Sequence, residues 1–206
     1  RKTVGTVTTA YAYDLNGHLL GEYDGTGTAI QEIAWLGDTP IAAMRSGTTA
    51  TDIFPIWTDH LDTPRLVTNT GGAARWDWPN TDPFGANLPN DNPAGLGAFQ
   101  FNLRFPGQLH DPETGTHYNY FRDYEPGIGR YVQSDPIGLK GGINTYGYVG
   151  STPLLRIDAR GEEGVSPERL RERAVEPLRE LRFPERRRVD RKSTRLNSSH
   201  VALARM

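Results

Sequence analysis

The sequence lacks cysteine, long apolar runs and, before residue 161, any clear helical pattern. Without cysteine, the 206-residue chain can form neither a disulfide framework nor a thiolate nucleophile. No apolar run approaches the roughly 20 residues that a membrane-spanning helix needs. Residue 1 is Arg rather than Met and no signal peptide is visible, so we expect an internal fragment whose targeting information lies elsewhere.

Charge and aromatic residues are divided unevenly along the chain. Residues 1–161 carry 11 Lys and Arg against 17 Asp and Glu, whereas residues 162–206 carry 12 against 8. All 9 tyrosines and all 4 tryptophans lie in the first part. An acidic, aromatic body with a basic tail argues against a nucleic-acid-binding protein.

Glycine and proline are abundant. The 23 glycines and 15 prolines stand among aromatic and β-branched residues, a composition typical of short strands joined by tight turns. Residues 6–22 show the pattern, because an alternating run ends at Tyr13, turns through Asn16-Gly17 and resumes at His18. Similar runs recur at 29–36, 40–44, 53–57, 65–68 and 73–78, with a loop at 95–102. We therefore predict an antiparallel β-meander.

Residues 116–124 look like one further strand. Their alternation predicts His117, Asn119 and Phe121 on one face, with Arg122 on the other. His110 and His117 are seven residues apart and do not have the spacing of metal ligands, so we expect no metal and no cofactor.

Several segments resemble bacterial Rhs (rearrangement-hotspot) proteins, in the order in which that family has them. Residues 11–19 (YAYDLNGHL) are similar to its tyrosine-aspartate (YD) repeat, and residues 59–65 (DHLDTPR) to its aspartate-histidine segment. Four further segments resemble the family's RHS repeat-associated core domain: DPFG at 82–85, LRFPGQ at 103–108, DPETG at 111–115 and GRY at 129–131.

The resemblance implies a domain division and a fold. Residues 1–58 would be YD-repeat strands, residues 59–161 the core domain, and residues 162–206 a truncated variable C-terminal region. The fold is then mainly β, one arc of a hollow shell of the Rhs and toxin-complex type, with a short helical tail. Ser166-Pro167 is a typical helix start for that tail, whereas residues 193–206 look like a sequencing artefact.

The resemblance also implies a role in a bacterial polymorphic toxin. The shell encloses a C-terminal toxin in cis, and a secretion-machinery spike protein and an immunity protein are candidate partners. Such a protein is made in the cytoplasm and is then secreted or displayed at the cell surface. The alternative is a non-catalytic surface or adhesion module built from the same repeats.

Two aspartates and an arginine are candidates for a self-cleaving site. Peptide hydrolysis by two carboxylates needs one protonated and one ionised group that share a water, and closeness of like charges favours that state. Asp135 and Asp158 each begin an Asp-x-x-Gly turn, and Arg122 could stabilise developing negative charge. The resemblance implies these three residues as an aspartyl autoprotease that cuts near Glu162 and Glu163.

The second turn departs from the family pattern. It reads DARGE, with Ala159 where the family has proline and Glu162 where it has leucine. The glutamate adds charge where the family has an apolar residue, so we expect slower processing. Taken alone, both turns also fit ordinary structural turns, because an aspartate carboxylate readily accepts nearby backbone N–H groups.

Overall fold

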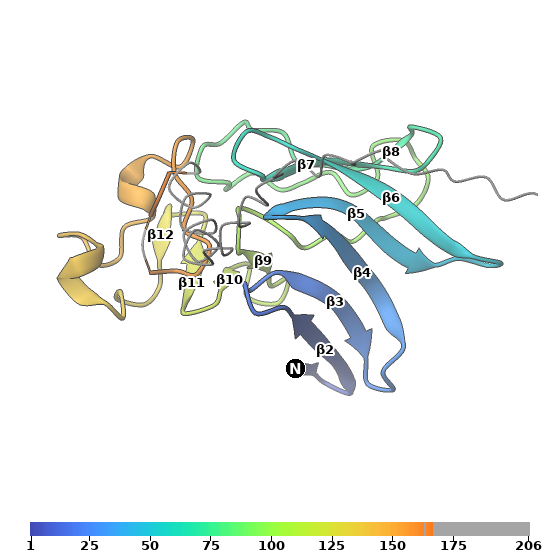
Figure 1. Ribbon diagram of the computed structural model, residues 1–206, viewed down its shortest axis with the longest axis horizontal. Coiled ribbons are helices and arrows are strands. Elements are labelled where there is room, and N and C mark those ends of the chain that lie inside the picture. The colour runs from blue at the N-terminus through green and yellow to red at the C-terminus, as the bar shows by residue number, and fades with distance from the viewer. Residues whose placement is uncertain (163, 167–206) are drawn as a thin grey trace, which may run out of the picture.

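The first eight strands form one antiparallel sheet in sequence order. The computed structural model describes residues 1–162 and 164–166. The strands of this sheet are β1 (Lys2–Val4), β2 (Val7–Tyr13), β3 (Leu19–Asp24), β4 (Ala29–Leu36), β5 (Thr39–Ser46), β6 (Thr51–Thr58), β7 (Pro64–Thr68) and β8 (Ala74–Asp77). Each strand pairs with the next, and together they form a curved layer (Figure 1). The predicted meander is confirmed, and residues 95–102 are irregular as expected.

Aspartate-initiated turns connect three pairs of neighbouring strands, β2–β3, β3–β4 and β6–β7. Between β2 and β3, Asp14 Oδ1 accepts the backbone N–H groups of Asn16 and His18, each at 2.8 Å. Gly17 completes the turn with φ of +92°, a conformation that costs a residue without Cβ little. The same carboxylate-to-backbone pattern recurs at Asp24 and at Asp59. Hydrogen bonds between an aspartate carboxylate and nearby backbone N–H groups therefore determine where these turns form.

A second, smaller sheet lies beside the first (Figure 1). Its strands are β9 (Leu109–His110), β10 (His117–Asn119), β11 (Arg122–Glu125) and β12 (Arg130–Tyr131), in the order β12-β11-β10-β9. The prediction of one strand over 116–124 was wrong. Tyr120 adopts φ of +54° and the chain reverses there, so Asn119 pairs directly with Arg122.

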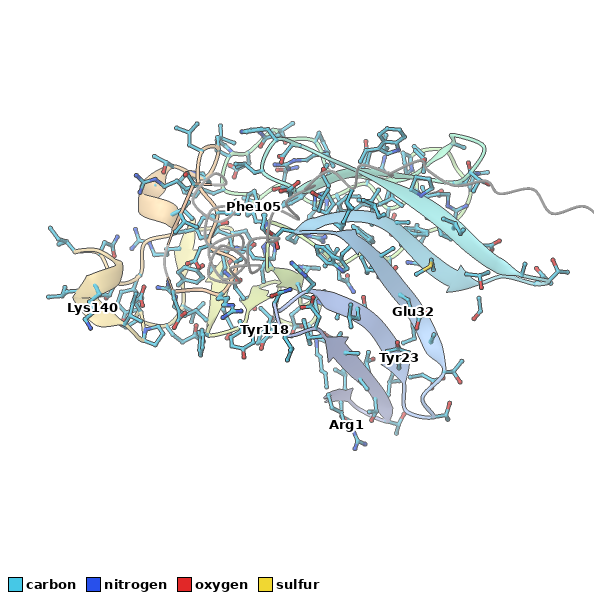
Figure 2. The ribbon with its side chains drawn as sticks, viewed as in Figure 1. Arg1, Tyr23, Glu32, Phe105, Tyr118 and Lys140 are labelled. Carbon is cyan, nitrogen blue, oxygen red and sulfur yellow. The ribbon has the colours of Figure 1, made fainter. Side chains whose placement is uncertain are left out.

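The core is aromatic and lies where the two sheets meet. Its buried rings include Trp76, Trp78, Phe99, Phe101, Phe105, Tyr124, Tyr131 and Tyr148. Phe105 is central, as Figure 2 shows, with its ring 5.4 Å from Trp78 and 5.7 Å from Tyr148 between centroids. These rings bind the second sheet to the first by apolar burial and by tilted and stacked aromatic contacts.

Irregular chain follows β12 and contains two short 3₁₀ helices, η1 (Gly138–Gly141) and η2 (Val149–Ser151). Lys140, on η1, lies at the end of the molecule away from the large sheet (Figure 2). In the described part of the chain, no helix is long and apolar enough to span a membrane. The predicted helical tail falls on residues 167–206, which lie outside the described residues, as does Glu163.

Candidate active site

The structure brings the three predicted site residues together. Arg122 begins β11, Asp135 follows β12, and Asp158 lies near the end of the described chain. Arg122 Nη2 lies 3.0 Å from Asp135 Oδ2 and 3.3 Å from Asp158 Oδ2. The side chains are almost fully buried, with 2% of Arg122 and 4% of each aspartate side chain exposed. One guanidinium nitrogen therefore joins two buried carboxylates from distant parts of the sequence.

A tight turn aims Asp135 at the arginine. Its Oδ1 accepts the backbone N–H of Ile137 at 2.9 Å, and its carbonyl accepts that of Gly138 at 3.0 Å. Gly138 has φ of +61°, so the turn takes the Asp-x-x-Gly form that the sequence predicts. The turn occupies one carboxylate oxygen and leaves the other for Arg122.

Asp158 is held by more donors than Asp135. Its Oδ2 accepts the hydroxyl of Tyr131 at 2.9 Å and the guanidinium of Arg122, while its Oδ1 accepts the backbone N–H of Glu162 at 2.9 Å. Asn119 Nδ2 donates to the Tyr131 hydroxyl at 2.7 Å and to the Asp158 carbonyl at 2.8 Å. Asp158 therefore lies in a rigid network of donors.

Tyr131 is the residue that sequence reasoning missed. Burial raises its pKa well above the usual value and the Asp158 charge adds to that effect, so the phenol keeps its proton. Its ring also lies beneath the Arg122 guanidinium, whose central carbon is 3.7 Å from the ring centroid. The available signal was its place in the GRY segment, four residues before Asp135.

Glu162, on the N-terminal side of the predicted cut, bonds to Asp158 and shares a neighbour, Gly141, with Asp135. Its N–H donates to Asp158, as described above. Its carbonyl oxygen lies 3.0 Å from the point where a Cβ on Gly141 would stand, and the same Cβ would overlap with Asp135 Oδ2. The Glu162 carbonyl and the Asp135 carboxylate therefore lie against the same side of Gly141, a position that admits no side chain.

The backbone before Glu162 is fixed as well. Arg122 Nε donates to the Gly161 carbonyl at 2.6 Å, and the Phe121 N–H to the Arg160 carbonyl at 3.2 Å. Gly161 has φ of +69°, and a Cβ there would stand only 2.6 Å from the Asn119 carbonyl oxygen. The β10–β11 turn thus holds residues 160–161 in contact with the site.

A cleft borders one side of this arrangement. The cleft has a volume of about 600 Å³ and lies between residues 103–109, the turns of the first sheet, residues 157–160, Glu162 and Val165. Asp158 and Glu162 line it, whereas Arg122 and Asp135 do not.

The side chains of His60, His110 and His117 make structural contacts. His60 Nε2 donates to the Leu154 carbonyl at 2.9 Å, and His117 Nδ1 lies 2.8 Å from Gln108 Oε1. Burial lowers the pKa of His117 to about 2 and that of His110 to about 4, so both rings are neutral at pH 7. Within residues 1–162 and 164–166, no group of His, Asp and Glu is arranged to hold a metal ion.

Comparison with known proteins places the chain in a family. The model of the teneurin YD-shell family matches residues 39–145, slightly more than half of the sequence. The chain belongs to the YD-shell family. The match covers the segments that resemble Rhs proteins between Asp59 and Tyr131, so that resemblance is confirmed.

Bacterial toxins are among the relatives of this YD-shell chain. It is 40% identical over 104 residues to toxin protein Tse5 of Pseudomonas aeruginosa, and 38% identical over 102 residues to probable deoxyribonuclease RhsB of Dickeya dadantii. Each alignment covers 50% of this chain and 7% of the relative, so the chain spans a small part of those proteins. A crystal structure of TcdB2-TccC3-Cdc42 aligns with 75% of this chain and 10% of its own, at TM-score 0.47 and 18% identity.

Proposed function

We propose that this chain is the part of a toxin shell that cuts itself between Glu162 and Glu163. One observation carries the proposal: Arg122 joins two buried carboxylates, and the Glu162 backbone donates to one of them and lies with the other beside Gly141. Burying two like charges against one cation is costly, and charged groups arranged in this way are frequent at catalytic sites. Two neighbouring carboxylates are the groups that aspartyl hydrolysis uses, which supports the proposal.

The hydrogen bonds assign a role to each carboxylate. Asp158 accepts from three donors, which hold its carboxylate in place beside the Glu162 backbone, so we assign it the role of general base. Asp135 accepts from the Ile137 N–H and pairs with Arg122, and we assign it the role of general acid. Its Oδ2 lies on the same side of Gly141 as the Glu162 carbonyl oxygen, where a general acid belongs.

The proposed reaction uses these roles. Asp158 takes a proton from a water, and the water oxygen bonds to the Glu162 carbonyl carbon. Asp135 gives its proton to the carbonyl oxygen. The intermediate then collapses: the C–N bond breaks, Asp158 passes its proton to the leaving nitrogen of Glu163, and Asp135 regains a proton from a hydroxyl of the intermediate as the carbonyl forms again. The products are a new α-carboxyl group at Glu162 and a new α-amine at Glu163, and both aspartates return to their starting states.

Arg122 has two functions in this scheme. Its guanidinium offsets the charge of the carboxylate pair, and its Nε holds the Gly161 carbonyl one residue before the scissile carbonyl. Holding the reacting carbonyl in a fixed position lowers the barrier by removing the cost of orienting it. The same residue therefore stabilises charge and positions the substrate segment.

The surrounding biology follows from the relatives named as toxins. We propose that the curved sheet is an arc of a shell that encloses the C-terminal region in cis, with domain limits at residues 58 and 161. The intact protein would be secreted or surface-delivered by a bacterium, with a spike protein of the secretion machinery and an immunity protein as partners.

Intact-mass spectrometry of the purified chain tests the proposal. We expect a fragment ending at Glu162 to accumulate, and the substitution Asp158→Asn to slow its appearance by at least about 100-fold, the usual worth of an acid–base group. A single intact chain, or equal cutting of the Asp158→Asn variant, would refute the proposal.

A further inference from the structure

The residues after the predicted cut are bound to the body of the protein. Val165 forms an isolated antiparallel bridge with Ile157, the residue before Asp158. The Ile157 N–H donates to the Val165 carbonyl at 2.9 Å, and the Val165 N–H donates to the Ile157 carbonyl at 2.8 Å. The segment on the C-terminal side of the cut therefore pairs with the strand-like segment that carries the proposed base.

The Val165 side chain fills an apolar pocket. Val165, Ile157 and Leu61 are 5%, 6% and 3% exposed and form a buried cluster separate from the main core. Leu61 belongs to the turn in which its own N–H donates to Asp59 Oδ1 at 2.9 Å. The neighbouring His60 binds the Leu154 carbonyl, so this turn is tied to the chain that leads to Asp158. The pocket is thus built from two remote segments.

Gly164 meets a different constraint. A Cβ at this position would stand 2.8 Å from Val149 Cα, and Val149 is a 3% exposed residue of the main core. The nearest obstacle is backbone rather than the flexible end of a side chain, so it cannot move aside easily. Only glycine fits at 164.

We infer that Gly164 and Val165 occupy a substrate subsite, which takes a glycine followed by a branched aliphatic residue. The inference rests on the proposed function. Gly161 and Glu162 are held before the cut, and Gly164 and Val165 are held after it. Anchors on both sides fix the peptide bond against the two aspartates. They also select which sequences can follow the shell and still be cut.

Substitutions at the subsite test this inference in the full-length chain. The rate of appearance of the fragment ending at Glu162 is measured by intact-mass spectrometry for Val165→Asp, Val165→Ile and Gly164→Val. We expect Val165→Asp and Gly164→Val to slow cutting by about tenfold or more, and Val165→Ile to cut within about twofold of the unmodified chain. Val7→Asp controls for the added charge, because Val7 is 68% exposed on β2.

Hydrogen exchange supplies a readout that does not depend on cutting. In chains kept intact by Asp135→Asn, the Ile157 amide should exchange at least about tenfold faster when Val165→Asp is added, because the bridge is lost. Melting temperatures of the same samples show whether the body remains folded.

The outcomes separate the inference from the proposed function. If the unmodified chain is cut and Asp135→Asn is not, while Val165→Asp and Gly164→Val cut at the normal rate, the subsite is wrong and the active site stands. If the unmodified chain is never cut, the proposed function fails. An Ile157 amide that exchanges equally fast with and without Val165→Asp overturns the subsite in either case.

Discussion

Two turns of this protein share the pattern Asp-Pro-x-Gly and have different surroundings. In Asp82-Pro83-Phe84-Gly85, the Asp82 Oδ1 accepts the Phe84 N–H at 2.8 Å, and the Asp82 carbonyl accepts the Gly85 N–H at 3.1 Å. The turn that begins at Asp135 makes the equivalent bonds at 2.9 Å and 3.0 Å. Their glycines have φ of +78° and +61°. The two backbones are thus equivalent.

The difference lies in what each aspartate carboxylate contacts beyond the shared turn bond. Asp135 Oδ2 faces Arg122 in a buried site beside Asp158, whereas Asp82 Oδ1 also accepts the Ala86 N–H and completes a structural turn. The short sequence therefore determines the turn, and distant residues determine whether its aspartate has further chemistry. A local motif alone does not identify a catalytic aspartate.

Removing the Arg122 guanidinium, which pairs with both aspartates, should have the largest effect on stability. Arg122→Met leaves two buried carboxylates without their positive partner, so we expect the free energy of unfolding to fall by about 3–5 kcal/mol. Arg130→Met, at an exposed position of β12, should change it by less than about 0.5 kcal/mol. Urea unfolding followed by tryptophan fluorescence measures both. Equal effects would show that Arg122 holds no buried pair.

Adding a methyl group beside Asp135 should have the next largest effect on stability and should also slow cutting. The methyl of Gly141→Ala would overlap with Asp135 Oδ2 and approach the Glu162 carbonyl. We expect a loss of about 1–3 kcal/mol in unfolding free energy together with slower cutting. Gly71→Ala is the matched control, since its nearest neighbour, Asn69 Oδ1, is 3.4 Å away. Normal cutting by Gly141→Ala would contradict the placement of Glu162 beside Asp135.

Removing either of two tyrosine hydroxyls should have the smallest effect on stability, and only one of the two removals should affect cutting. The Tyr131 hydroxyl donates to Asp158, and the Tyr124 hydroxyl donates to the Phe84 carbonyl in the structural turn. Each Tyr→Phe change should cost about 1 kcal/mol of stability. Only Tyr131→Phe should slow cutting. A rise of about 1.36 kcal/mol in the activation barrier slows a reaction tenfold, so we expect a decrease of roughly tenfold.

The effect of Tyr131→Phe on the cutting rate should not depend on pH. Because burial keeps the pKa of Tyr131 well above its ordinary value, its hydrogen bond to Asp158 persists as the pH rises. The ratio of cutting rates between the unmodified chain and Tyr131→Phe should therefore stay constant from pH 7 to about pH 10. A ratio that falls towards one across this range would show that the phenol ionises.

Local patterns predicted much of this structure. The meander follows from alternating runs and from aspartate-initiated turns, whose hydrogen bonds span four residues or fewer. Arg122, Asp135 and Asp158 were predicted as one constellation, and the structure places them together. Their catalytic role stays a prediction.

Non-local contacts account for what the sequence pattern did not predict. Alternation across residues 116–124 did not reveal the reversal at Tyr120, which places Asn119 and Arg122 opposite one another. Tyr131 looked like any strand tyrosine, because its bond to Asp158 joins residues 27 positions apart. Val165 likewise depends on Leu61, which packs against it from a remote turn.

The most direct measurement compares Asp135→Asn with Asp82→Asn in the purified full-length chain. Both asparagines keep an oxygen that can accept the turn hydrogen bond, so both turns should persist, which circular dichroism verifies. By intact mass, Asp82→Asn should cut at Glu162 like the unmodified chain, and Asp135→Asn should cut at least about 100-fold more slowly. Equal cutting by the two variants would contradict the assignment of Asp135 to an active site.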